Sequence, residues 1–161
     1  MDASEMVIQG ATAVVALAAL GLAVYEGRET RRHNRLTVRP ELRIRQHQRG
    51  LKESLGLSVS NDGSGPALIN ECNIWVDNVA TSGWEDAIAK LTFHHHTVGF
   101  ENITSAVIPP GNRVWLLSAQ PKQGDDEAAK RELSHCITRL RVTISYSSLY
   151  NERNTANFGA R

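Results

Sequence analysis

Residues 7–25 carry no charged side chain, and this apolar run constrains the fold more than any other feature of the chain. At about 1.5 Å per residue, a helix of this length spans roughly 28 Å, close to the thickness of the hydrocarbon core of a bilayer. Its polar members, Gln9 and Thr12, both lie in the first two turns. A helix satisfies all of its backbone hydrogen bonds internally, which lipid requires. The run therefore predicts a transmembrane helix.

The main alternative to an anchor is a cleaved signal peptide. A secretory signal begins with a basic segment, whereas the residues before the apolar run include Asp2 and Glu5 and neither Lys nor Arg. The triplet Ala16-Leu17-Ala18 has the small residues of a cleavage site but lies in the middle of the run. A helix of a soluble core would carry a polar stripe, which the run lacks. We therefore expect an uncleaved single-pass anchor, preceded by a short acidic segment at residues 1–6.

Arginine follows the apolar run at once and sets the expected orientation. Residues 26–45 have a local net charge of +4, whereas residues 46–161 sum to −1. Basic residues beside a transmembrane helix mark its cytoplasmic side, so we expect the amino terminus outside and residues 36–161 in the cytoplasm. For a bacterial source this is the inner (plasma) membrane; the sequence leaves a eukaryotic source open. The residues expected at the membrane interface are Tyr25, Arg28, Arg31, Arg32 and Arg35.

The basic segment has two readings. Attraction to anionic lipid headgroups accounts for arginines close to a bilayer. Nucleic-acid binding would need a basic face on the folded domain, and that part of the chain is nearly neutral. We therefore expect the lipid bilayer as a partner, and no nucleic acid.

Small side chains form a stripe along the apolar run. Thr12, Ala16, Ala19 and Ala23 recur at intervals of four, three and four residues, which places them on one face of a helix. Such faces let transmembrane helices approach one another closely. Alanine is abundant all around this run, so composition explains the stripe equally well. The four residues are a candidate helix-association face.

The rest of the chain shows the alternation of antiparallel strands. In the clearest run, Leu140, Val142, Ile144 and Tyr146 alternate with polar residues, a pattern typical of a sheet packed on one face. Pro40 must end the basic juxtamembrane helix expected at residues 26–35 and suggests an edge position for the first strand. No regular strand–helix–strand rhythm appears, so we expect a mainly β domain, an antiparallel β-sandwich. Its strands are predicted around residues 36–45, 55–59, 68–76, 114–117, 140–146 and 156–158.

Two short helices are expected between these strands. Ser82 and Glu85 have the spacing of a capping box, and the following residues Trp84, Ala87, Ile88 and Leu91 share one helical face. A second helix would begin at Asp125 or Asp126, with Ala129, Leu133 and Cys136 facing inward.

Three segments carry a resemblance to known proteins: residues 61–67, residues 108–111 and residues 146–150. They resemble the strand edges of small bacterial single-pass membrane-anchored proteins of uncharacterised function. In that family an N-terminal helix and a basic juxtamembrane segment precede a cytoplasmic immunoglobulin-like sandwich. The resemblance implies this fold and this location, and it brings no catalytic residues. In the first segment we expect Gly63 and Gly65 to supply positive φ angles, with Pro66 stiffening the return into the strand.

Few residues suggest chemistry. The triplet His94-His95-His96, with His135, Cys136 or Cys72, invites a metal interpretation, but consecutive residues of an extended chain point to opposite sides, which leaves at most His94 and His96 for one ion. We expect the triplet to be a solvated loop. Asp125-Asp126-Glu127 suits a helix start, and the two cysteines suit buried thiols in a reducing cytoplasm.

No nucleophile elbow, phosphate loop or dinucleotide motif is present in the sequence. We therefore expect no catalytic, cofactor-binding or metal-binding residue. The expected function is a membrane-tethered, non-enzymatic binding or signalling module whose sandwich presents loops or an edge strand to a protein partner or to a second copy. The alternative is a small membrane-acting effector, for instance in antiviral defence, whose helices oligomerise after the domain senses a ligand.

Overall fold

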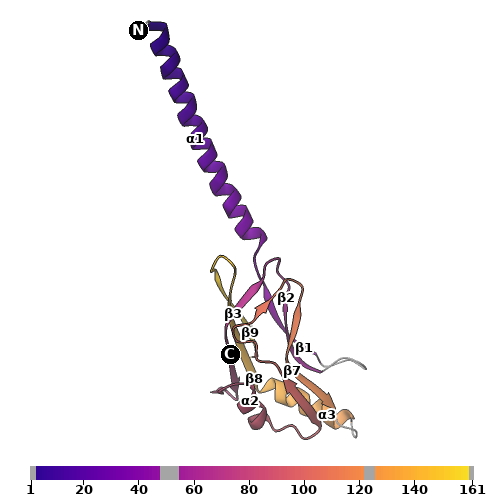
Figure 1. The fold of residues 1–161 in the computed structure, drawn as a ribbon. Coiled ribbons are helices and arrows are strands. Elements are labelled where there is room, and N and C mark those ends of the chain that lie inside the picture. Colours follow the sequence, from indigo (N-terminus) through magenta and orange to yellow (C-terminus); the bar gives the residue numbers. More distant parts are fainter. Residues whose placement is uncertain (1–2, 48–54, 122–125, 160–161) are drawn as a thin grey trace. The chain divides into compact units, whose positions relative to one another are not determined.

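The computed structural model describes residues 3–47, 55–121 and 126–159. The chain divides into two units, Met1–Thr37 and Val38–Arg161, which we treat separately. The first is a single helix, α1 (Ala3–Thr37), whose segment Ile8–His33 is long and apolar enough to cross a membrane (Figure 1). The helix runs two residues beyond the expected boundary at Arg35, so the prediction of a strand from residue 36 is wrong. No Gly or Pro interrupts the helix between residue 28 and Pro40.

The second unit consists of two antiparallel sheets. One has the order β1-β2-β7-β5, with β1 at Leu42–His47, β2 at Leu55–Asn61, β7 at Arg113–Pro121 and β5 at His96–Phe100. The other sheet has the order β4-β3-β8-β9, with β4 at Val79–Ala80, β3 at Ala67–Val76, β8 at Leu140–Ser147 and β9 at Arg153–Phe158. A short strand, β6 (Val107–Ile108), also pairs with β3. This is the strand order of immunoglobulin domains, in which the sheets are ABED and C′CFG. The predicted fold class is confirmed.

The core lies between the sheets and follows the predicted alternation. Leu140, Val142, Ile144 and Tyr146 of β8 are all buried, and they share one apolar cluster with residues of the opposite sheet such as Leu57. Burying a side chain of this size contributes about 1.5–3 kcal/mol. Both faces of this cluster come from strands, which is what defines a sandwich.

Two irregularities shift the alternation in ways that the sequence pattern did not indicate. The β3–β8 register changes between Ile69 and Glu71, so Ile69 rather than Leu68 is buried at that end of β3. The β2–β7 register changes beside Leu57, and Leu116 and Leu117 are both buried although they are adjacent. Each extra residue in a strand reverses the face of the residues that follow it.

Helices α2 (Trp84–Leu91) and α3 (Asp126–Thr138) connect β4 to β5 and β7 to β8. The predicted inward residues of both helices are buried, except Ile88, which is partly buried: Trp84, Ala87, Leu91, Ala129, Leu133 and Cys136. The predicted capping box is wrong, because the N-cap of α2 is Gly83 and makes no side-chain cap. The Ser82 N–H instead donates to the Asp86 carboxylate at 3.2 Å. The cap proposed at Asp125 lies outside the described residues.

Candidate functional site

Three loops and the entering chain meet at one end of the sandwich, which we call the loop end. Strand pairing establishes this: Leu42 pairs with Asn61, and Leu68 pairs with Ser147. The loop end comprises residues 38–41, the β2–β3 turn at residues 62–66, the β6–β7 turn at residues 109–112 and the β8–β9 loop at residues 148–152. Within the domain, α2 and α3 lie at the opposite end (Figure 1).

Asn61 holds the loop end together from inside. It is fully buried, and its side-chain N–H groups donate to the carbonyl oxygens of Gly65 and Ile108 at 2.8 and 2.9 Å. Its Oδ1 accepts from the backbone N–H groups of Glu41 and Gly63 at 3.2 and 3.1 Å. One amide therefore joins the entering chain, the β2–β3 turn and β6, with every hydrogen-bonding position of the side chain in use.

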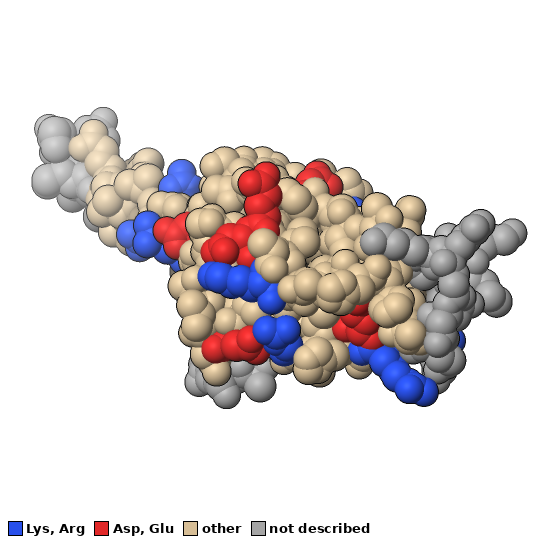
Figure 2. All heavy atoms as spheres, turned by 90° about the horizontal axis from the view of Figure 1, so that it is seen from below, with Lys and Arg blue, Asp and Glu red and all other residues tan. Residues whose placement is uncertain are grey.

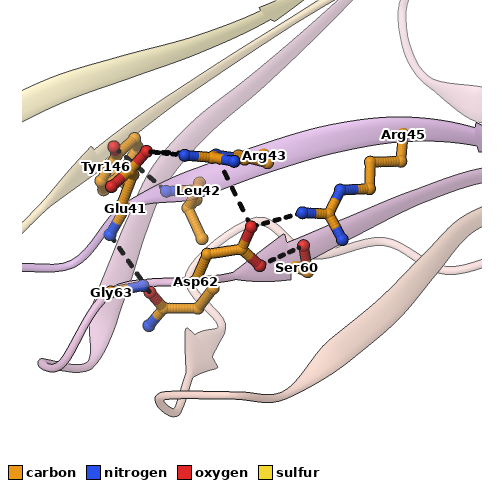
Figure 3. A network of polar contacts seen from close by, with 9 residues as sticks. Glu41, Leu42, Arg43, Arg45, Ser60, Asp62, Gly63 and Tyr146 are labelled. Carbon is orange, nitrogen blue, oxygen red and sulfur yellow. Dashed lines mark hydrogen bonds and ion pairs between the residues drawn. The ribbon is translucent and has the colours of Figure 1, made fainter.

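Asp62, which follows Asn61 in the sequence, belongs to a charged surface cluster with Glu41, Arg43 and Arg45 (Figure 3). Asp62 accepts a hydrogen bond from Ser60 Oγ at 2.8 Å and pairs with Arg43 and Arg45. Arg43 also donates to Glu41 at 2.8 Å, and this hydrogen bond raises the pKa of Arg43. The cluster contains two guanidinium groups and two carboxylates, so it is charge-balanced. Exposed pairs of this kind contribute little to stability, and here they orient β1 against the turn.

The glycines of the β2–β3 turn serve a different purpose from the predicted one. Gly63 and Gly65 do not have positive φ angles. A Cβ atom on Gly63 would lie 2.4 Å from the Arg39 carbonyl oxygen, and one on Gly65 would lie 2.1 Å from the Val38 carbonyl oxygen. Both residues are glycine because the entering chain passes directly against the turn.

The histidine triplet is organised by a residue that the sequence analysis missed. Glu132 on α3 accepts the backbone N–H groups of His94 and His95, and its Oε2 lies 2.8 Å from His96 Nδ1. His96 is buried on β5, so the expectation of a solvated loop is wrong for this residue. Burial would raise the pKa of Glu132, but the hydrogen bonds from His96, His94 and His95 together outweigh it and lower the pKa.

Within the part of the chain that the structure describes, no group of three His, Cys, Asp or Glu side chains is arranged to hold a metal ion. Cys136 lies nearby, with its thiol 3.5 Å from the Leu91 carbonyl oxygen, and burial raises its pKa. The arrangement fastens α3 to the start of β5. For the acidic triplet at residues 125–127, the side chains lie outside the described part.

A hollow of about 320 Å³ is lined by Cys72, Trp84, Phe100 and neighbouring residues. The indole N–H of Trp84 is buried and has no hydrogen-bond partner among the described residues. Burial raises the pKa of Cys72 to about 11, which leaves the thiol protonated at neutral pH and a poor nucleophile. Cys72 is therefore not an activated nucleophile in this hollow.

The residues predicted at the membrane lie on α1. Tyr25, Arg28, Arg31 and Arg32 are exposed on the helix, and the side chain of Arg35 is outside the described residues. In the apolar segment, the Thr12 hydroxyl donates to the Ile8 carbonyl oxygen at 2.8 Å, which satisfies it within the helix. Helical geometry places Thr12 on one face with Ala16, Ala19 and Ala23, all of them exposed.

The sandwich also has an unprotected sheet edge at β5. This strand pairs with β7 on one side only among the described residues. Residues 97–100 of β5 are Thr, Val, Gly and Phe, without a charge or a proline, and Phe100 is 42% exposed. Most native edges carry charges or proline, which prevent pairing with another chain.

Comparison with curated proteins finds no match to this chain. A family model described as a domain of unknown function, DUF8453, matches residues 6–159. The match includes both the apolar segment of α1 and the sandwich. The chain therefore belongs to the DUF8453 family, a domain of unknown function.

Proposed function

We propose that this chain is a non-enzymatic binding module tethered to the inner membrane of a bacterium. In this proposal, α1 spans the bilayer with its amino terminus outside, and the sandwich lies in the cytoplasm. The apolar segment Ile8–His33 supports the span, and the arginines that follow residue 25 support the orientation. The partner is a protein that adds a strand to β5.

The open edge of β5 is the observation that carries this proposal. The other sheet edges are protected in recognisable ways: β1 carries Arg43 and Arg45, β9 lies in contact with β1, and β4 is only two residues long. In contrast, β5 offers five residues of strand whose exposed part is uncharged. An extended peptide gains affinity from main-chain hydrogen bonds to such an edge and specificity from alternate side chains.

The visible charge distribution supports a protein partner over nucleic acid. On the face shown in Figure 2, basic and acidic side chains are interspersed, and neither sign dominates. Binding to a phosphate backbone needs a continuous basic surface, because neutralising several phosphates supplies most of the affinity.

Thr97→Lys tests the proposal. A lysine on an edge strand opposes pairing with a further strand. The full chain is purified from native membranes in mild detergent, and the stoichiometry of co-purifying protein is measured. We expect a stoichiometric partner that is lost with Thr97→Lys and kept with Thr104→Lys, a matched change in the exposed segment that follows β5. Equal loss in both variants, or retention in both, would refute strand addition.

One observation favours a second function, that of a membrane-acting effector. The small residues Thr12, Ala16, Ala19 and Ala23 share an exposed face of α1, and such faces allow close helix association. An effector would depolarise cells when overexpressed, and changing Ala16 and Ala19 to Ile would abolish the effect. A binding module would leave the membrane potential unchanged.

A further inference from the structure

The loop end exposes large apolar side chains. The large hydrophobic residues exposed in the described part of the domain are Val79, Phe100, Val107, Leu149 and Tyr150. Two of them, Leu149 and Tyr150, are adjacent in the β8–β9 loop of the loop end. Val107 lies next to this end, because it pairs with Leu68 beside Ser147. Leu149 is 61% exposed and Tyr150 is 44% exposed. Pro109 and Pro110, in the neighbouring turn, are also exposed.

Hydrogen bonds hold the β8–β9 loop in a defined shape. The Ser148 hydroxyl accepts the N–H groups of Tyr150 and Glu152 at 3.2 and 3.3 Å. The Ser148 N–H donates to the Glu152 carbonyl oxygen at 3.0 Å, and Asn151 adopts a φ of 62° to close the turn. Leu149 and Tyr150 are therefore presented at the tip of an ordered loop, which lowers the conformational entropy lost on binding.

The chain connectivity brings this end of the domain close to the bilayer. Only residues 38–41 separate the end of α1 from β1, and they run along the loop end. The hydrocarbon core takes about twenty residues of helix, and a headgroup layer of about 5–8 Å takes four or five more. If the span begins at residue 7, roughly seven residues of the helix, or about 10 Å, extend beyond the headgroup layer before the helix ends at Thr37.

The polar residues of the loop end complement a membrane surface. Arg39 is exposed at the loop end, and Arg113 and Arg153 are exposed directly beside it. Of the acidic residues there, Glu41 and Asp62 pair with arginines of β1, and Glu152 is exposed in the β8–β9 loop. Long basic side chains reach anionic headgroups, and tyrosine and leucine enter the boundary between headgroups and acyl chains. A protein-binding surface would not need these features so close to the point where the chain leaves the helix.

We propose that the loop end docks on the headgroup layer of the membrane that holds α1, with Leu149 and Tyr150 as the inserted side chains. The proposal rests on the membrane tethering proposed above. It also assigns different tasks to two parts of the domain: the loop end contacts lipid, and the β5 edge remains for the protein partner.

Photo-crosslinking tests the docking. The full chain is reconstituted in vesicles of phosphatidylethanolamine and phosphatidylglycerol, with Leu149→p-benzoylphenylalanine or the control Val79→p-benzoylphenylalanine. Val79 is 59% exposed, nearly the same as Leu149, but it lies in β4, beyond the opposite end of β3. We expect lipid adducts at position 149 in several-fold excess over position 79, with unchanged thermal unfolding of both variants.

Two outcomes would overturn the docking: lipid adducts at position 149 no higher than at position 79, or adducts joining position 149 to a second copy of the chain. The same photoprobe in native membranes adds a third, a dominant adduct to another protein. Alkaline carbonate extraction distinguishes a failure of the docking proposal from a failure of the membrane tethering on which it rests. A chain that leaves the vesicles in carbonate refutes the tethering itself, whereas a chain that stays embedded without lipid adducts refutes only the docking.

Discussion

Replacing Asn61 by alanine should be the most damaging single change at the loop end. The substitution removes four hydrogen bonds and leaves the buried carbonyl oxygens of Gly65 and Ile108 without their partner. A typical hydrogen bond contributes about 1 kcal/mol net, and a buried group left unsatisfied costs about 1–3 kcal/mol. We expect Asn61→Ala to lower the free energy of unfolding by about 4 kcal/mol, which for a domain of this size lowers Tm by roughly 12–16 °C.

Tryptophan fluorescence of the full chain in detergent measures this loss. All three tryptophans, Trp75, Trp84 and Trp115, lie in the sandwich, so the signal reports on that domain alone. Asn73→Ala is the control, because Asn73 is exposed on β3 and its amide makes only a long contact of 3.5 Å with Glu71. The control should change stability by less than about 0.5 kcal/mol. A loss below about 1 kcal/mol for Asn61→Ala would refute the reasoning that this amide organises the loop end.

The described contacts and burial also predict the effects of two further substitutions and the reactivity of one cysteine. Gly65→Ala should cost about 2–3 kcal/mol in chemical denaturation because its Cβ would meet the Val38 carbonyl oxygen, whereas Gly27→Ala, with open space around it, should not destabilise the chain. The pKa of Glu132 is lowered from 4.5 in the folded chain, so its contribution to stability is present above pH 4.5 and is lost as the pH falls through the lowered value. Glu132→Gln should therefore flatten the acid side of the stability curve measured by denaturant midpoints, and an unchanged curve would contradict the assignment. With its pKa raised to about 11, Cys72 should react with iodoacetamide about a hundredfold more slowly at pH 7.5 than an ordinary thiol, and the rate should keep rising with pH up to about 11.

Periodicity was sufficient to predict the fold class and much of the core. The alternation of Leu140, Val142, Ile144 and Tyr146 and the inward face of α2 were both predictable, because burial on one face imposes a period on the sequence. Periodicity fails where one residue is inserted: Leu68 is in phase with the buried Ile74 and Val76, but the bulge at Asn70 places Ile69 in the core instead. A bulge leaves no distinctive residue type in β3, so the pattern alone does not reveal it.

The contacts of the candidate site were largely beyond the sequence. Glu132 and His96 are 36 residues apart and meet only because α3 packs beside the start of β5. Gly63 and Gly65 were correctly recognised as a turn, but the reason for them was wrong. A glycine that gives φ freedom and a glycine that gives space to a neighbouring backbone look identical in sequence, and only the position of residues 38–41 distinguishes them.

If the chain is tethered to a membrane as proposed, the open edge of β5 belongs to a molecule that is confined to a two-dimensional surface. Confinement raises the effective concentration of neighbouring copies, and an uncharged strand edge is a template for the same edge of another molecule. On this proposal, cells that make the chain in excess over the proposed partner would accumulate strand-to-strand assemblies along the membrane. Matched production of the two proteins would then be a condition for keeping the chain monodisperse.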